Sequence, residues 1–198
     1  MACMNNNDYE ELIKKRLSDY RFHHSVCVAK KAIELAKKHS LDEEKAYVAG
    51  ILHDITKEEP LDVQKELIEA NGYKMTELEI NSPNIYHQMS GAEYIRNVLN
   101  IDDEDIIGGV RYHTTGRADM TDFEMMIYLA DFTSDDRNYP DVDIMRQKTE
   151  KSFLDGMLYS LKYTITKLTQ QEKQIHPDTL HCYNWVVEQI KKKVKIYE

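Results

Sequence analysis

The sequence predicts an all-α fold with one buried core, and three observations support this prediction. Apolar residues recur every three to four positions over most of the chain, as on one face of a helix. Alternating apolar and polar patterns, which are typical of strands, are nearly absent. A chain of 198 residues that is 41% hydrophobic can also bury a proper core. Because no repeat and no Gly/Ser-rich linker interrupts the pattern, we expect a single domain over residues 1–198.

In the N-terminal part of the chain, capping residues mark where helices begin. Asp8 is expected to cap a first helix, a second covers about residues 23–38, and Asp42 caps a third. Pro60 suits the first turn of a fourth helix, which the Asn-Gly pair at 71–72 ends. These signals predict four helices before residue 73.

The rest of the chain continues with helices separated by short polar breaks. Ser-Pro-Asn at 82–84 precedes a helix over about residues 85–99, and Asp102 starts the next, which ends in the loop at 114–117. Thr121 with Glu124 reads as a capping box that opens a helix through Asp131. Two long helices, split near residues 176–177, are expected after Pro140.

Charge, cysteine content and hydropathy exclude several classes of function. The net charge of -9 disfavours a platform for duplex nucleic acid, which needs a basic surface for phosphates. A small phosphorylated substrate stays compatible, because a metal and a few cationic side chains can form a positive pocket. Cys3, Cys27 and Cys182 form no CxxC pair and no disulfide framework, which fits the cytoplasm. With no signal peptide and no stretch that could span a membrane, we expect a soluble protein without a membrane partner.

The doublet His53-Asp54 lies in the otherwise apolar run at 49–55 and is the strongest sign of a functional site. A carboxylate beside an imidazole is costly to bury without a partner, and a divalent metal suits both groups. A histidine hydrogen-bonded in the core beside an aspartate at the helix end is the alternative, and the doublet alone does not separate the two. Metal-assisted hydrolysis is therefore the first hypothesis.

Four further residues are candidates for the same centre. Asp131 lies within an apolar helix, where an aspartate without a cation is costly. His24, His87 and His113, taken one at a time, fit ordinary half-buried histidines as well as metal ligands. Only their combination with the doublet favours a metal site.

The order His24, His53-Asp54, Asp131 resembles the H…HD…D signature of the HD-domain phosphohydrolases, an all-helical family. His-Asp-Ile-Thr-Lys-Glu at 53–58, Tyr-His-Thr-Thr-Gly-Arg at 112–117 and Ile-Tyr-Leu-Ala-Asp-Phe at 127–132, with Arg137 and Pro140 after them, resemble its YqeK branch. The resemblance covers about residues 18–170. It implies an HD-domain helical bundle with a C-terminal helical extension at about 171–198.

Members of that branch hydrolyse diadenosine tetraphosphate symmetrically into two ADP, so the resemblance implies this activity and a metal-activated water. It implies that His24, His53, Asp54 and Asp131 bind one metal, and that His87 and His113 bind a second, bridged by Asp54. The implied metal is iron, as one ion or two, and manganese also suits the ligands. The residues expected to carry the chemistry are Asp54, Lys57, His87 and His113.

Several residues near these ligands are expected to bind the substrate's phosphates. Lys57 follows the doublet by about one helical turn, and Gly116 allows a close approach of the backbone. An arginine can grip phosphate with two donors. The complete expected set is Arg21, Lys57, Thr115, Gly116, Arg117 and Arg137. A solvated surface charge is the alternative for Lys57, Arg117 and Arg137.

Other functions and partners stay open at this point. The chain could be an HD-type nucleotidase for another nucleotide, a nucleotide sensor without hydrolysis, or a helical interaction module. Relatives tend to have a less acidic stretch than residues 133–136, which bears on nucleotide preference. The basic run at 191–195 is read as a solvated helix face. The sequence leaves a homodimer open.

Overall fold

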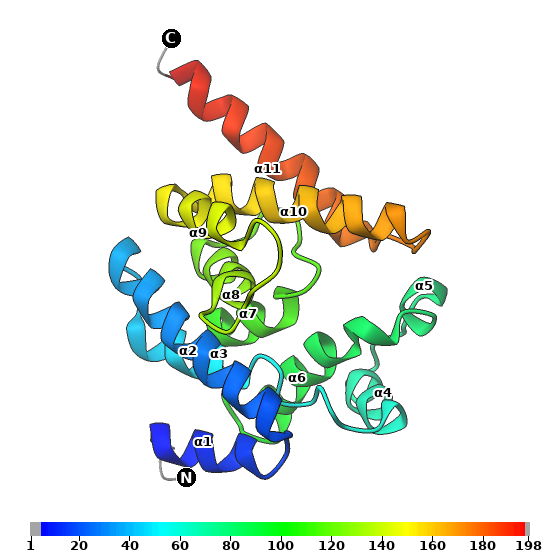
Figure 1. Cartoon of the computed structure of the whole chain (residues 1–198). Coiled ribbons are helices and arrows are strands. Elements are labelled where there is room, and N and C mark those ends of the chain that lie inside the picture. The colour runs from blue at the N-terminus through cyan, green and yellow to red at the C-terminus, as the bar shows by residue number, and fades with distance from the viewer. Residues whose placement is uncertain (1–4, 197–198) are drawn as a thin grey trace.

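The computed structural model describes residues 5–196, and every regular element within them is a helix (Figure 1). This confirms the all-α prediction. The elements are α1 (Asn6–Lys14), α2 (Asp19–His39), α3 (Glu43–Leu52), α4 (Leu61–Glu69), α5 (Glu77–Ile80), the 3₁₀ helix η1 (Pro83–Ile85), α6 (Tyr86–Asn97), α7 (Glu104–Tyr112), α8 (Asp122–Thr133), α9 (Val142–Lys151), α10 (Phe153–Gln170) and α11 (Pro177–Ile196).

Helices α3 and α8 form the centre of the molecule. Residues 46–52 of α3 and 123–130 of α8 are all buried. A helix that is buried on all sides has neighbours all round it, and here α2 and α7 pack against both central helices. The C-terminal ends of α3 and α8 therefore lead directly into the protein interior, where His53 and Asp131 lie.

Helices α2 and α3 pack unusually close at Gly50. A Cβ atom at this position would lie 2.7 Å from the Cα of Ala29 and 3.3 Å from the Cβ of Ala32. Only a residue without a side chain permits this approach. The contact fixes the end of α3, where the His-Asp doublet begins, against α2.

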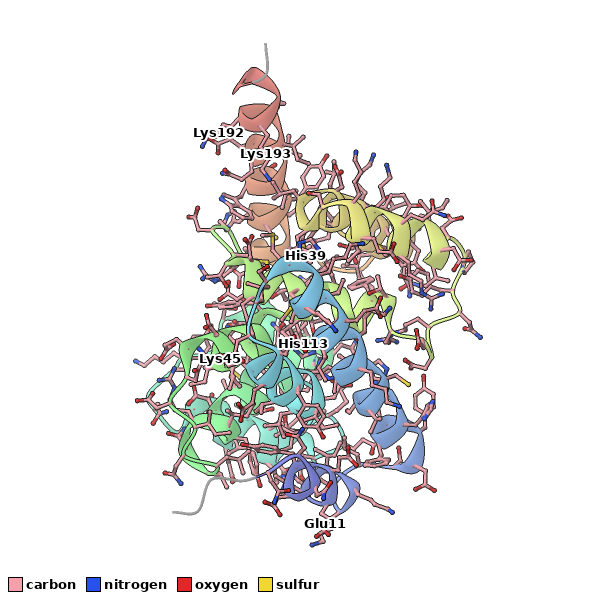
Figure 2. The ribbon with its side chains drawn as sticks, turned by 90° about the vertical axis from the view of Figure 1, so that its left-hand side faces the viewer. Glu11, His39, Lys45, His113, Lys192 and Lys193 are labelled. Carbon is pink, nitrogen blue, oxygen red and sulfur yellow. The ribbon has the colours of Figure 1, made fainter. Side chains whose placement is uncertain are left out.

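The outer helices cover two sides of this centre. Around α4 and α6 a small separate core forms from Ile68, Met75, Tyr86 and Met89. On the opposite side α9 and α10 pack against α8 and α11 packs against α10, and the C-terminal part of α11 extends beyond the bundle (Figure 1). Lys192 and Lys193 lie on this extending part (Figure 2). Lys191–Lys193 are exposed, as predicted for the basic run at 191–195, whereas the side chains of residues 194 and 195 lie outside the described part of the chain.

The predicted helix starts are partly confirmed. Asp42 caps α3, and Thr121 with Glu124 forms the capping box of α8. The prediction for α1 was wrong by three residues: Asn5 is the N-cap, and Asp8 supplies the returning side chain of the capping box. Asp103 caps α7 in place of Asp102, because its Oδ1 accepts from the amides of residues 105 and 106.

Three other boundaries differ from the predictions. Helix α2 begins at Asp19, one turn before the expected start near residue 23. The short helix α5, with a capping box of Thr76 and Glu79, was not predicted. Three helices, not two, follow Pro140, because the extended backbone of Ser152 (φ -167°, ψ 138°) separates α9 from α10.

Cys27 and Cys182 are free thiols, whereas Cys3 lies outside the described residues. Among the helices of residues 5–196, none combines the length and the apolar composition that crossing a bilayer requires.

Candidate metal centre

Six side chains predicted as metal ligands converge in the interior. They come from five places: His24 from α2, His53 and Asp54 directly after α3, His87 from α6, His113 directly after α7, and Asp131 from α8. All but Asp131 are at most 2% exposed. His113, labelled in Figure 2, lies deep among the helices.

The four imidazoles form a continuous row. Ring centroids are 5.2 Å apart for His24 and His53, 5.1 Å for His53 and His113, and 4.9 Å for His113 and His87. The Nε2 atoms of His87 and His113 approach to 3.0 Å. Residues that are far apart in the sequence therefore present their ring nitrogens to one shared space.

The two carboxylates lie between these rings. Asp54 Oδ2 is 3.5 Å from Nε2 of His53, and Asp54 Oδ1 is 3.4 Å from Nε2 of His87 and 3.8 Å from Nε2 of His113. Asp131 Oδ1 is 3.0 Å from Nε2 of His24 and 3.9 Å from Nε2 of His53.

These positions define two groups of donor atoms that share His53. The ligand atoms of His24, His53 and Asp131 lie within 4.8 Å of one another, and so do those of His53, Asp54 and His113. His87 adjoins the second group.

Hydrogen bonds from Nδ1, the ring nitrogen that faces away from the carboxylates, orient His53 and His113. Nδ1 of His53 donates to the carbonyl of Gly50 (2.8 Å), and Nδ1 of His113 donates to the carbonyl of Val110 (2.7 Å). Both carbonyls belong to the last helical turn, where backbone acceptors are left free. A proton on Nδ1 leaves the lone pair on Nε2, facing the carboxylates, as a metal ligand requires.

His24 is oriented by a side chain instead. Its Nδ1 lies 2.8 Å from Oδ2 of Asp136, while its Nε2 faces Asp131. Burial lowers the pKa of His24, but the hydrogen bond and charge of Asp131 raise it by more, so the net pKa is raised. A proton on Nε2 therefore occupies the place where a metal would bind, between His24 and Asp131.

The other three histidines of the centre are neutral and its two carboxylates are ionised at pH 7. Burial lowers the pKa values of His53 and His87, and that of His113 to about 4. Burial raises the pKa of Asp131, but Arg137 and His24 lower it by more, so the net pKa lies well below its usual range. The pKa of Asp54 is also lowered on balance, by the surrounding imidazoles and Lys57. Neutral imidazoles with ionised carboxylates are a donor set that fits a divalent metal.

Three of the predicted phosphate-binding residues border the centre. Nη1 of Arg21 is 3.1 Å from Asp54 Oδ2, and Arg137 donates to the Asp131 carboxylate. Nζ of Lys57 lies 2.9 Å from Nε2 of His87. The carboxylates and the ring nitrogens are thus flanked by three cations.

The other three predicted phosphate-binding residues do not border the centre, and they shape the α7–α8 loop instead. Thr115 is buried and bonds Gln88. Gly116 has φ +66°, and a Cβ atom there would lie 2.8 Å from Sγ of Cys182. Arg117 pairs with Glu124 at 3.0 Å and lies over the Tyr112 ring. None of the three makes a hydrogen bond or ion pair with the six converging side chains.

Sequence reasoning missed two residues that contact the centre. Asp136 bonds Nδ1 of His24, and Oγ1 of Thr114 lies 3.2 Å from Nε2 of His87. Asp136 belonged to a stretch marked only as acidic, and Thr114 preceded the residues chosen from the same motif. No local pattern separates either from its polar neighbours.

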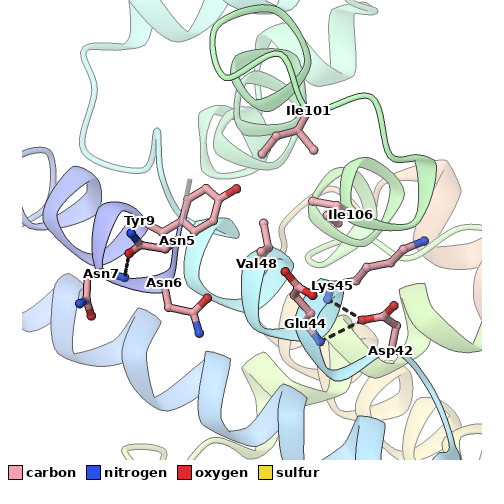
Figure 3. A pocket seen from close by; sticks show the side chains of 10 residues that line it. All are labelled: Asn5, Asn6, Asn7, Tyr9, Asp42, Glu44, Lys45, Val48, Ile101 and Ile106. Carbon is pink, nitrogen blue, oxygen red and sulfur yellow. Dashed lines mark hydrogen bonds between the residues drawn. The ribbon is translucent and has the colours of Figure 1, made fainter. Parts of the chain in front are cut away.

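A separate cavity lies away from the metal centre. It has a volume of about 890 Å³ and is lined by α1, the start of α3, and residues before and within α7 (Figure 3). Its ionic groups serve the fold: Asp42 caps α3, and Lys45 pairs with Asp103 and Asp105, each at 2.9 Å. None of the six converging residues lines it.

A helical bundle that buries histidine and aspartate donors in two adjacent groups is the arrangement expected of a hydrolase with a divalent-metal site. The HD domain model matches residues 21–135, more than half of the sequence. The chain belongs to the HD domain family.

Comparison with known proteins agrees with this assignment. The chain is 35% identical to a symmetrical bis(5'-nucleosyl)-tetraphosphatase of Bacillus subtilis, over 93% of this chain and 98% of that protein. It is 34% identical to a protein of the same name from Halalkalibacterium halodurans, over 91% and 96%. The fold is similar to a crystal structure from Clostridium acetobutylicum, which is described as a predicted HD superfamily hydrolase involved in NAD metabolism. The TM-score is 0.92 at 28% identity, and the match covers 95% of this chain and 100% of that one. The predicted resemblance is confirmed.

Proposed function

We propose that this chain hydrolyses diadenosine tetraphosphate symmetrically into two molecules of ADP. The observation that carries the proposal is the convergence of six donor side chains, flanked by Arg21, Lys57 and Arg137, in one buried centre. Near full-length similarity to symmetrical tetraphosphatases supports this substrate.

The donor atoms suggest which residues would hold the metal. His24, His53, Asp54 and Asp131 would bind one divalent ion, and His87 and His113, with Asp54 as a bridge, would bind a second. Iron or manganese suits imidazole and carboxylate ligands without a thiolate. When bound, such ions polarise phosphate oxygens and make hydroxide available at neutral pH.

The protein's own cations would handle the negative charge of the tetraphosphate. Arg21, Lys57 and Arg137 lie within hydrogen-bonding distance of the ligand residues, so they face the same space as the scissile phosphates would. Charge-assisted bonds from these groups would stabilise the charge that builds up on the leaving phosphate. Asp54, which lies between His53, His87 and His113, would act in catalysis by holding the ions beside the attacking water. Contacts of Thr115, Gly116 and Arg117 with phosphate stay predictions.

The direct test is product analysis with protein loaded with iron or manganese. We expect ADP as the product from diadenosine tetraphosphate, and we expect Asp54→Ala to lose both bound metal and turnover. Asp62→Ala, at an exposed position on α4, is the control and should keep both. Products of ATP and AMP, or no turnover by the metal-loaded protein, would contradict the proposal.

A substrate panel separates this activity from its alternatives. Faster release of phosphate from a mononucleotide than of ADP from diadenosine tetraphosphate would indicate a nucleotidase. Tight nucleotide binding without any product would indicate a sensor.

We infer a cytoplasmic setting from the free thiols of Cys27 and Cys182. Sedimentation would decide whether the protein is a homodimer.

A further inference from the structure

A cleft of about 340 Å³ lies beside the metal centre. Its walls are the segment before α6, the α7–α8 loop, the C-terminal part of α10 and the loop that leads to α11. This volume is within the range of small-ligand sites. The cleft therefore has room for a ligand group of nucleoside size.

The cleft and the metal centre share Thr114. This residue lines the cleft, and its Oγ1 lies 3.2 Å from Nε2 of His87. Gln88, the residue after His87, accepts from the amide of Thr114 at 3.1 Å and fixes the loop there. A ligand in the cleft therefore lies next to the His87 side of the centre.

The charge of the lining suits an anionic ligand. The chain carries a net charge of -9, yet no carboxylate lines this cleft, and Lys173 adds a positive charge. The cavity beside α1, by contrast, is lined by the carboxylates of Asp42 and Glu44 as well as by Lys45. The cleft beside His87 is thus the better place for a group attached to a polyphosphate.

The polar groups of the lining suit a purine base. The side chains of Asn84 and Gln174 are exposed and make no hydrogen bond within the described residues. Each amide offers one donor and one acceptor, the pair that matches the N6 and N7 edge of adenine. Ile85 and Leu168 add apolar surface to the same cleft. Free amides beside aliphatic side chains are what a base-binding site requires.

We propose that this cleft binds the purine nucleoside of one half of the substrate, with its phosphates directed past Thr114 to the metal centre. The inference takes its ligand class, an adenosine polyphosphate, from the proposed function. It assigns the selection of the nucleoside to Asn84 and Gln174, which lie outside the metal-binding residues.

The test compares ADP with pyrophosphate, which carries the same two phosphates without a nucleoside. Calorimetric titration of the manganese-loaded protein measures both affinities in the wild type and in the double variant N84A/Q174A. We expect the double variant to bind ADP about 10-fold more weakly, the loss typical of two hydrogen bonds, and pyrophosphate as the wild type does. Gln171→Ala, an exposed glutamine in the same loop but outside the cleft, should leave both affinities unchanged.

Steady-state kinetics add a second readout. The KM for diadenosine tetraphosphate should rise in the double variant, while kcat stays the same. An unchanged ADP affinity, or an equal loss for ADP and pyrophosphate, would overturn the inference. If the wild type yields no ADP from diadenosine tetraphosphate but the double variant still loses ADP affinity selectively, the proposed hydrolysis fails and the nucleoside cleft stands.

Discussion

Asp136 differs from the other groups that orient the histidines, because it can be replaced without touching the backbone. His53 and His113 donate to carbonyls of their own helices, whereas His24 donates to the carboxylate of Asp136. Ser134 in turn donates to Oδ1 of Asp136 at 2.7 Å. The carboxylate is thus held in place and keeps Nε2 of His24 directed at Asp131.

Replacing Asp136 should therefore weaken metal binding although the residue is not a ligand. We expect Asp136→Ala to raise the metal dissociation constant by about 10- to 100-fold, the usual effect of losing such an orienting partner. Asp136→Asn keeps an acceptor oxygen and should lose less. Competition with a fluorescent chelator measures the constant, and Asp135→Ala, at the exposed neighbouring position, is the control. Wild-type metal affinity in Asp136→Ala would contradict the assignment.

Arg137 and Arg117, two of the three arginines predicted to bind phosphate, should behave differently when replaced. Arg137 bonds the Asp131 carboxylate, so its removal takes a cation from the centre. We expect Arg137→Ala to raise the KM for diadenosine tetraphosphate by about 10-fold or more, since hydrogen bonds to charged groups contribute roughly 1.5–3 kcal/mol. Metal content is measured in parallel, to separate lost substrate binding from lost metal.

Arg117 pairs with Glu124 and covers Tyr112, so Arg117→Ala should change KM less than twofold and lower the melting temperature instead. This pair of variants tests whether Arg117, one of the three predicted phosphate-binding residues that shape the α7–α8 loop, acts in the fold or on the substrate. A KM increase in Arg117→Ala equal to that in Arg137→Ala would show that Arg117 reaches the substrate.

At the scale of the elements, the approach of α3 to α2 couples the fold to the site. A methyl group at Gly50 would meet the backbone of Ala29 at 2.7 Å, and a backbone atom cannot rotate away as a side chain can. We expect Gly50→Ala to destabilise the protein by roughly 1–3 kcal/mol. Because His53 follows this helix and bonds the Gly50 carbonyl, metal affinity should fall as well.

Chemical denaturation and metal titration check this prediction. Gly91→Ala on α6 is the comparison, since its added carbon meets Cγ1 of Val110 at 3.3 Å, a side-chain atom that can shift. Its effect on both quantities should be the smaller one. Equal effects of the two substitutions would show that the close helix approach at Gly50 does not matter.

How far the sequence predicts these elements depends on how local each signal is. Asp42 and the pair Thr121–Glu124 act on amides within three residues, so their role as caps can be read directly. Helix α5 carries the same kind of capping box, but its four residues are too few for a periodic pattern. The break at Ser152 has neither glycine nor proline, so it depends on the packing of α9 and α10 and not on a local signal.

The residues of the site differ in the same way: some have a local signal in the sequence, and others reach the centre only through the tertiary fold. His53, Asp54 and Asp131 could be found because they are polar residues in apolar segments, where burial demands a partner. Asp136 and Thr114 lie in polar loops, and only the folded chain brings them to His24 and His87. Which arginine faces the centre likewise depends on the tertiary fold, as the positions of Arg137 and Arg117 show.

At the scale of the whole molecule, the buried imidazoles make stability depend on pH. Burial lowers the pKa values of His53, His87 and His113 below the 6.5 of an unfolded chain. The unfolded state therefore takes up protons first as the pH falls, and the folded state loses stability below pH 6.5. Burial and the charge of Lys38 also lower the pKa of His39, whereas His24, whose pKa is raised, acts in the opposite direction, so four histidines oppose one.

We therefore expect the free energy of unfolding of the metal-free protein to fall between pH 7 and pH 5. His113, with a pKa of about 4, should account for roughly 2 kcal/mol of this loss on its own. Urea denaturation at each pH measures the slope, and His113→Asn should make it shallower, since asparagine does not titrate. His181→Asn, at an exposed position on α11, should keep the wild-type slope.

The prediction is limited to the range from pH 7 to pH 5 because the pKa values of Asp54 and Asp131 are lowered. Protonation of these two carboxylates affects stability only at more acidic pH. A bound divalent metal should steepen the same dependence, since protons and metal compete for the lone pairs on Nε2. Wild-type and His113→Asn curves that run parallel from pH 7 to pH 5 would show that the imidazole of His113 is not buried in its neutral form, and the donor set inferred for the metal would fall with it.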